Sequence, residues 1–108
     1  MNQALVEEIY PLSPAQQGMF LHSLSDLKSE LYIEQSCVPY EGPVERTTFE
    51  RAWQLAMERH PILRTAFVAE DLGEPLQVVF KQVPLAIEWV DWSVLSHQAQ
   101  EERLQTHW

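Results

Sequence analysis

The residues best suited to chemistry in this sequence are two arginines and a histidine in the segment RHPILRTAF, which begins at Arg59. An amphipathic helix is predicted to end at His60, because Pro61 disfavours helical backbone in the residue before it and lacks the N–H that a longer helix would use. A strand with alternating side chains is predicted to follow over 62–68. Arg59 and Arg64 would then flank a corner between helix and strand. Taken alone, they are explained as a cation favoured at a helix C-terminus and a strand arginine that reaches solvent.

Two segments resemble core motifs of nonribosomal peptide synthetase condensation domains. RHPILRTAF, at 59–67, meets every fixed position of the second core motif, RHxxLRTxF. SPAQQGMFLH, at 13–22, is similar to the first core motif, SPxQxGMxFH, with Phe20 and Leu21 in exchanged order. Single matches continue through 75–79 to the Asp-Trp-Ser segment, so the resemblance runs from about Ile9 to the last residue. Two ordered motifs are much harder to match by chance than one short pattern.

This resemblance implies a supporting role for the arginines. In condensation domains, an arginine of the second motif pairs with the aspartate of a third motif, HHxxxDG, and holds the loop of the catalytic histidine in shape. A guanidinium fork suits this task because it fixes orientation as well as charge. Arg64 is the first candidate for active-site support and Arg59 the second. Without the aspartate, a buried Arg64 would be an uncompensated charge, so we expect it to stay solvated.

No catalytic residue is assigned within the sequence. Its four histidines are His22, His60, His97 and His107, and none belongs to an HHxxxDG segment. The resembled family carries that motif beyond the Asp-Trp-Ser segment, so the chain is expected to stop before reaching it. His60 falls on the predicted buried face of a helix, and we expect it to be structural.

A helix is predicted from Ser13 onward. Ser13 as N-cap, Pro14 at the first helical position and Gln16 three residues after the cap form a capping box. In the resembled family this helix borders the tunnel of the acceptor's carrier arm, which makes Gln17 and Gly18 candidate lining residues. Close packing of the helix at Gly18 is an equally weighted alternative, because glycine lowers helix propensity by about 1 kcal/mol relative to alanine.

The remaining pattern predicts an α/β fold. Thr47 and Glu50 are expected to cap the helix that ends at His60, and Ser96 to cap a final helix. Strands are expected at 31–40, 76–80 and 85–90, the first leading through a right-handed crossover to the strand at 62–68, which forms a hairpin with 76–80. We therefore expect a two-layer mixed sheet with helices on one face. This fold resembles the N-terminal half of a chloramphenicol-acetyltransferase-like condensation domain in truncated form. The expected fragment covers 1–108, and 1–9 is an entry segment.

Composition limits the partners and cofactors. Sixteen acidic and seven basic residues give a net charge of −9, which repels phosphate backbones and anionic lipid surfaces. No apolar run approaches the roughly 20 residues of a membrane span, and Glu7 and Glu8 stand where a signal peptide carries positive charge, so we expect a cytoplasmic location. The single cysteine, Cys37, is expected to be a buried strand thiol. No metal-ligand spacing or phosphate loop occurs, so no directly bound metal or cofactor is expected.

The resemblance implies a portion of an amide-forming enzyme. Such a domain joins a donor aminoacyl or peptidyl thioester to the amine of an acceptor aminoacyl thioester, both carried on phosphopantetheine arms. The expected partners are the rest of the condensation domain and peptidyl or aminoacyl carrier domains. We expect the chain alone to be inactive. Two alternatives remain open: a non-catalytic folding or docking piece of a multidomain assembly, and an acyltransferase of another family that shares the fold.

Overall fold

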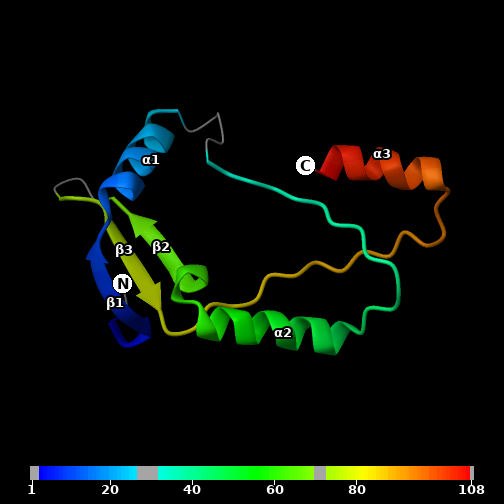
Figure 1. Ribbon diagram of the computed structural model, residues 1–108, viewed down its shortest axis with the longest axis horizontal. Helices are drawn as coiled ribbons and strands as arrows, with labels where there is room; N and C mark the ends of the chain where they lie inside the picture. The colour runs from blue at the N-terminus through cyan, green and yellow to red at the C-terminus, as the bar shows by residue number, and fades with distance from the viewer. Residues whose placement is uncertain (1–2, 27–31, 70–72, 108) are drawn as a thin grey trace.

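The structure is a computed structural model that describes residues 3–26, 32–69 and 73–107 of the chain. A small sheet lies at one end of an elongated molecule, and α3 lies at the other end (Figure 1). In chain order the elements are η1 (Gln3–Leu5), β1 (Val6–Pro11), α1 (Pro14–Ser25), α2 (Arg46–Arg59), η2 (Pro61–Arg64), β2 (Thr65–Val68), β3 (Leu76–Phe80) and α3 (His97–His107).

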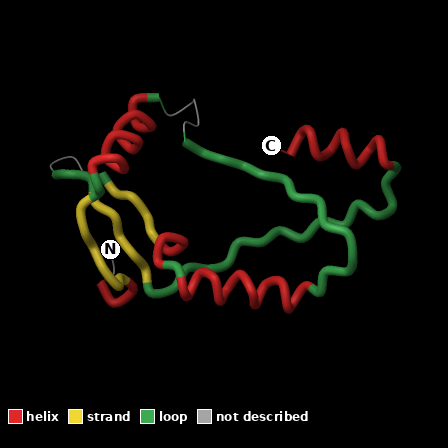
Figure 2. The backbone as a smooth tube through the Cα atoms, viewed as in Figure 1, coloured by secondary structure: helices red, strands yellow, loops and turns green. Residues whose placement is uncertain are grey.

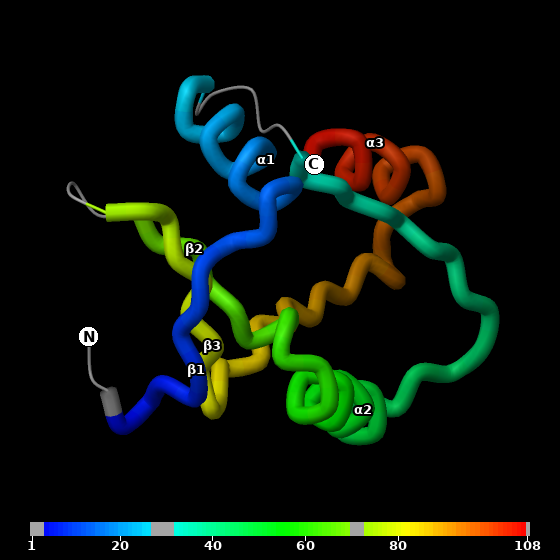
Figure 3. The backbone as a smooth tube through the Cα atoms, turned by 60° about the vertical axis from the view of Figure 1, so that its left-hand side comes forward, coloured from blue at the N-terminus to red at the C-terminus, as the bar shows by residue number. Residues whose placement is uncertain are grey.

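The sheet has three strands in the order β1-β3-β2, and both pairings are antiparallel. β3 lies in the middle, where Val78 and Val79 are buried. The predicted hairpin between β2 and β3 is confirmed, with Phe67 opposite Gln77. The expectation of a mixed sheet is wrong for the described residues, because the second neighbour of β3 is the strand β1, which returns antiparallel with Tyr10 opposite Gln77. Figure 3 shows the three strands side by side, with α1 following β1.

β1 departs from the sequence prediction, because it lies mostly in the segment 1–9 that was expected only to lead into the domain. Its sequence, VEEIYP, lacks regular alternation, and the pairing with β3 shifts register between Val6 and Glu8. A bulge of this kind adds a residue to one strand and interrupts the two-residue period. The sequence pattern that identifies a strand is therefore broken within the strand itself.

The corner after α2 is a 3-10 turn, and the strand that was predicted from residue 62 begins only at Thr65. Pro61 occupies the first position of η2, where its missing N–H costs nothing, and the Leu63 N–H donates to the His60 carbonyl at 3.0 Å. α2 ends at Arg59, one residue before the predicted end at His60. His60 is the residue after the helix and is exposed, so its predicted burial is wrong.

Two long segments are extended without pairing to any described strand. Residues 33–40 and 82–91 were predicted to include strands, but both run as irregular chain (Figure 2). The expected crossover is therefore absent from the described residues, and Cys37 is exposed instead of buried. Alternating side chains indicate a strand only where a neighbouring strand receives the backbone hydrogen bonds.

The helix starts confirm two of the three predicted caps. Ser13 and Gln16 form the capping box of α1, and the Ser96 hydroxyl accepts the Ala99 N–H at 3.1 Å. The cap predicted at Thr47 is wrong. The Glu45 carboxylate accepts the N–H groups of Thr47 and Thr48 and starts α2 two residues earlier.

The helices do not form a second layer over one face of the sheet, as the two-layer prediction required. α2 runs away from the sheet and meets it at its C-terminal end, while α3 lies beyond the long segments (Figure 1). The radius of gyration is 18.1 Å, against about 13 Å for a compact domain of this length. Apolar side chains of the extended segments, such as Val38 and Tyr40, are largely exposed. No helix within the described ranges is long and apolar enough to span a membrane.

The Glu45 cap predicts an acid-sensitive start of α2. Hydrogen bonds from the Thr48 side chain, the Thr48 N–H and the Thr47 N–H hold the pKa of Glu45 below its ordinary value. Because the folded pKa is depressed, this stabilisation is present above the unfolded pKa of about 4.3 and is lost as the pH falls through the folded value. We expect helicity measured by far-UV circular dichroism to decline below about pH 4.

Glu45→Gln should remove part of this pH dependence, because its amide oxygen still accepts hydrogen bonds but does not titrate. Glu41→Gln, at an exposed position outside α2, is the matched control and should leave the titration unchanged. Identical acid profiles for Glu45→Gln and the unmodified chain would show that Glu45 does not set the acid stability of α2.

Candidate functional site

The two motif-like segments meet at the sheet. Residues 13–22 form the cap and most of α1, and residues 59–67 form the end of α2, the turn η2 and the first part of β2. They touch through Phe20 and Phe67, whose ring centroids lie 6.1 Å apart in a tilted arrangement. Such an aromatic pair contributes about 0.5–1.5 kcal/mol beyond the area that it buries. Two segments that are well separated in the sequence thus form one continuous region.

Arg64 is the centre of this region and is buried, with 6% of its surface exposed. Its Nε donates to the Met57 carbonyl at 2.7 Å, and its Nη2 lies 3.4 Å from the Glu58 carbonyl. Its Nη1 donates to the Phe80 carbonyl and to the Glu7 carboxylate, the latter at 3.0 Å. The guanidinium therefore connects the end of α2, the end of β3 and the strand β1.

The expectation that Arg64 stays solvated is wrong, because acceptors within the chain replace water. Two of the acceptors are carbonyls from the last turn of α2, which lack partners inside the helix. Glu7 supplies the counter-charge, although its side chain remains 45% exposed. η2 makes this possible, because the tight turn after Pro61 directs Arg64 back toward the helix that it follows.

The structure separates the two candidate arginines. Arg59 is the last residue of α2 and is exposed, whereas Arg64 is buried. A hollow of about 550 Å³ opens beside Arg64. Its lining mixes apolar and polar side chains, including Leu5, Met57, Lys81, Val83 and Leu85. Of the two arginines, only Arg64 lines this hollow.

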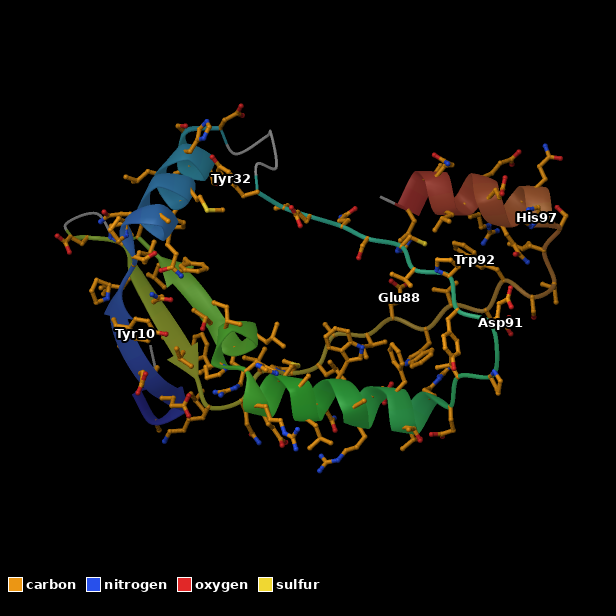
Figure 4. All side chains as sticks on the ribbon, viewed as in Figure 1. Tyr10, Tyr32, Glu88, Asp91, Trp92 and His97 are labelled. Atoms are coloured by element: carbon orange, nitrogen blue, oxygen red, sulfur yellow. The ribbon has the colours of Figure 1, made fainter. Side chains whose placement is uncertain are left out.

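A second, smaller hollow of about 260 Å³ lies between α1 and β2. Its lining is Gln16, Met19, Phe20, Ser23, Tyr32 and Phe67. The proposed tunnel residues Gln17 and Gly18 are not part of this lining. A Cβ added at Gly18 would meet nothing within 4 Å, so the alternative of close helix packing at that glycine is wrong. Tyr32 lies beside α1 and its hydroxyl is 2.9 Å from the His22 Nδ1 (Figure 4).

The histidines form no catalytic arrangement in the described residues. His22 contacts Tyr32, and His97 lies 3.3 Å from Glu101 on the exposed face of α3. The described part of the chain contains no group of three His, Cys, Asp or Glu side chains that could hold a metal ion. In the Asp-Trp-Ser segment, hydrogen bonds from the Ser93 hydroxyl and N–H keep the pKa of Asp91 below its ordinary value. This carboxylate caps a turn ahead of α3.

Two residues of the region were missed by the sequence reasoning. Glu7 is the carboxylate partner of Arg64, and Gln77 is a buried amide that bonds to α1. For Glu7 no signal was present, because it stands next to a second glutamate in an irregular strand. For Gln77 a signal existed: it is the only polar residue of the run LQVVF. A polar residue inside a buried strand must find a hydrogen-bond partner.

Comparison with known proteins identifies the family. The family model described as Condensation domain matches residues 6–107. The chain belongs to the condensation-domain family. This confirms the nonribosomal peptide synthetase condensation domain that was recognised from the two motifs.

The relatives are far longer proteins. A linear gramicidin synthase of Brevibacillus parabrevis is 43% identical over 99 residues, which are 92% of this chain and 2% of the relative. Tyrocidine synthase 2 of Brevibacillus parabrevis is 34% identical over 98 residues, 91% of this chain and 3% of the relative. Gramicidin S synthase 2 of Brevibacillus brevis is 30% identical over 102 residues, 94% of this chain and 2% of the relative. The chain thus corresponds to a few per cent of each of these synthases.

We predict that Arg64→Ala lowers the free energy of unfolding by about 2–3 kcal/mol, because it leaves carbonyls of α2 and β3 without a donor. The cost stays below the ~3–5 kcal/mol of a fully buried broken pair, because Glu7 is half exposed and can be solvated. Arg64→Lys should recover only part of the loss, since an ammonium cannot fork between these acceptors. Chemical denaturation followed by circular dichroism measures these changes.

Arg59→Ala is the control, because it removes a nearby arginine that is exposed. It should change the free energy of unfolding by no more than about 0.5 kcal/mol. Equal effects of Arg59→Ala and Arg64→Ala would contradict the structural role given to the Arg64 hydrogen bonds.

Proposed function

We propose that this chain is the N-terminal portion of a condensation domain that forms amide bonds in nonribosomal peptide synthesis. The observation that carries the proposal is the family match over residues 6–107, together with the contact between its two motif-like segments at Phe20 and Phe67. The substrates are a donor aminoacyl or peptidyl thioester and an acceptor aminoacyl thioester. Each is carried on the phosphopantetheine arm of a carrier domain, and the domain itself binds no cofactor.

The reaction is an acyl transfer from sulfur to nitrogen. The acceptor amine attacks the thioester carbonyl carbon, the C–N bond forms and the C–S bond breaks. The donor arm leaves as a thiol with the proton that the amine gives up. A base positioned at the amine assists this proton transfer. The proposal places that base in an HHxxxDG segment outside these 108 residues, since the sequence holds no such motif.

Within this chain, Arg64 is the first candidate for active-site support and Arg59 is the second candidate. In support of Arg64, its guanidinium is held at the edge of a hollow and already binds one carboxylate, that of Glu7. An aspartate from the HHxxxDG segment would find the same planar donor set there. Arg59 is exposed and would act from the surface. Gln17 and Gly18 are proposed to face the acceptor tunnel from α1.

The partners proposed are the rest of the condensation domain and the carrier domains. The exposed apolar side chains of the extended segments support this, because large apolar patches of soluble proteins commonly mark interaction surfaces. Val38 is 79% exposed and Val90 is 52% exposed. A non-catalytic folding or docking piece is the second candidate, favoured by the absence of HHxxxDG from the sequence.

We predict that the 108-residue chain alone forms no amide from two loaded carrier domains, but supports amide formation when it replaces the matching 99 residues of the linear gramicidin synthase. Arg64→Ala in this chimera should lower the rate of amide formation by about tenfold or more, equivalent to about 1.4 kcal/mol in the barrier. Product formation is followed by mass spectrometry of the carrier-bound species.

Arg103→Ala is the control for the chimera, because Arg103 is exposed on α3, outside both motif-like segments. It should leave the rate unchanged. A chimera that folds and accepts loaded carriers but forms no amide would overturn the catalytic proposal. Amide formation by the isolated chain would show that the HHxxxDG segment is dispensable.

A further inference from the structure

The central strand carries one buried polar side chain that neither motif-like segment contains. Gln77 is 5% exposed and lies between the apolar residues of β3. We propose that Gln77 is a positioning residue, whose carboxamide fixes the angle at which α1 leaves the sheet. Through α1 it would also set the position of the whole 13–22 segment.

Both hydrogens of the Gln77 side-chain amide are donated to acceptors outside β3. Its Nε2 donates to the Pro11 carbonyl at 3.0 Å and to the Gln16 Oε1 at 3.1 Å. The Gln16 Nε2 lies 3.5 Å from the Gln77 Oε1, so the two amides face each other. Gln77 therefore holds the last residue of β1 and the first turn of α1 at the same time.

Gln16 joins this contact to the start of the helix. Its Oε1 also accepts the Ser13 N–H at 2.8 Å, and the Ser13 hydroxyl accepts the Gln16 N–H at 3.2 Å. One amide oxygen thus completes the capping box and receives the hydrogen bond from the sheet. A capping box by itself stabilises a helix end but does not set its direction relative to other elements. The bond from Gln77 supplies that direction.

The packing of α1 alone is too weak to set this angle. No residue of α1 is buried, and the observed ring contact of the helix with the sheet is that between Phe20 and Phe67. Apolar contact is not directional, whereas a hydrogen bond weakens steeply as its angle departs from linearity. An amide that is nine-tenths buried also loses its hydration, so leaving its N–H groups unpaired is costly.

The angle matters because the hollow of about 260 Å³ lies between α1 and β2, with Gln16, Phe20 and Phe67 in its lining. A pivot of α1 at its first turn would widen or close this hollow. It would also move Gln17 and Gly18, whose link to the acceptor rests on the proposed function. The placement of α1 by Gln77 does not rest on the proposed function. The two proposals can therefore fail separately.

The experiment measures the α1-to-sheet distance in the 108-residue chain by pulsed electron paramagnetic resonance. Cys37→Ser removes the native thiol, and nitroxide labels are attached at Leu24→Cys near the end of α1 and Glu8→Cys on β1, both exposed positions. Leu24 lies about 15 Å along the helix axis from its first residue at about 1.5 Å per residue, so a pivot of about 15° moves it by about 4 Å.

We expect Gln77→Leu to shift the mean distance by about 4 Å, or to broaden its distribution about twofold. Gln16→Leu should have the same effect. The double variant should add nothing to either single change, because both remove one link. Gln98→Leu, on the exposed face of α3, is the matched control and should leave the distribution unchanged.

A distribution in Gln77→Leu that matches the unmodified chain would overturn the proposal. So would a double variant whose shift is the sum of the two single shifts. Should Gln77→Leu prevent folding, Gln16→Leu decides the matter, because Gln16 lies outside the sheet and is only half buried. An unchanged distance in Gln16→Leu would then exclude the amide pair as the element that sets the angle.

Discussion

The hydrogen bonds of one guanidinium hold the core of this structure together. Arg64 receives no support from a large apolar core, because the buried hydrophobic residues of the described chain are only Leu12, Val78 and Val79. The arginine instead brings the end of α2, the end of β3 and the carboxylate of Glu7 to a single point. A planar fork with five donors can serve these acceptors at once, and a lysine ammonium cannot. Without the hydrogen bonds of Arg64, α2 would have little contact with the sheet.

Polar side-chain contacts also set the orientation of the extended segment 82–91 relative to α2. Trp89 of the extended segment donates to the Glu50 carboxylate at 2.7 Å, and its ring lies under the Arg46 guanidinium and against Phe49. The segment 82–91 is therefore attached to α2 by side chains and not by a ladder of backbone hydrogen bonds. Where apolar burial is small, directional contacts of this kind decide how the elements are arranged.

The parts of the fold that depend on local sequence could be predicted, and those that depend on distant partners could not. The cap at Ser13, the end of α2 before Pro61 and the strand Leu76–Phe80 follow from residues within a few positions. Segment 82–91 alternates like a strand, and 33–40 carries apolar residues typical of one, but no local feature reveals whether a partner strand exists. In the same way, the sequence predicted that Arg64 lies at the corner after α2. It could not predict that Arg64 is buried, because its charge partner, Glu7, lies 57 residues away.

Arg64 and Glu7 differ in burial, which separates the fixed part of the corner from its counter-ion. The backbone carbonyls around Arg64 are fixed by α2 and β3, whereas the Glu7 side chain is 45% exposed. Leaving Arg64 without a counter-charge would be costly, because the guanidinium is buried, so Glu7 could turn into solvent only where another carboxylate replaced it. Under the proposed function, a second carboxylate that reached Arg64 would take the place of Glu7 while the carbonyl bonds remain. In the proposed function, this exchange lets the arginine that builds the corner also hold an aspartate loop brought by another part of the domain.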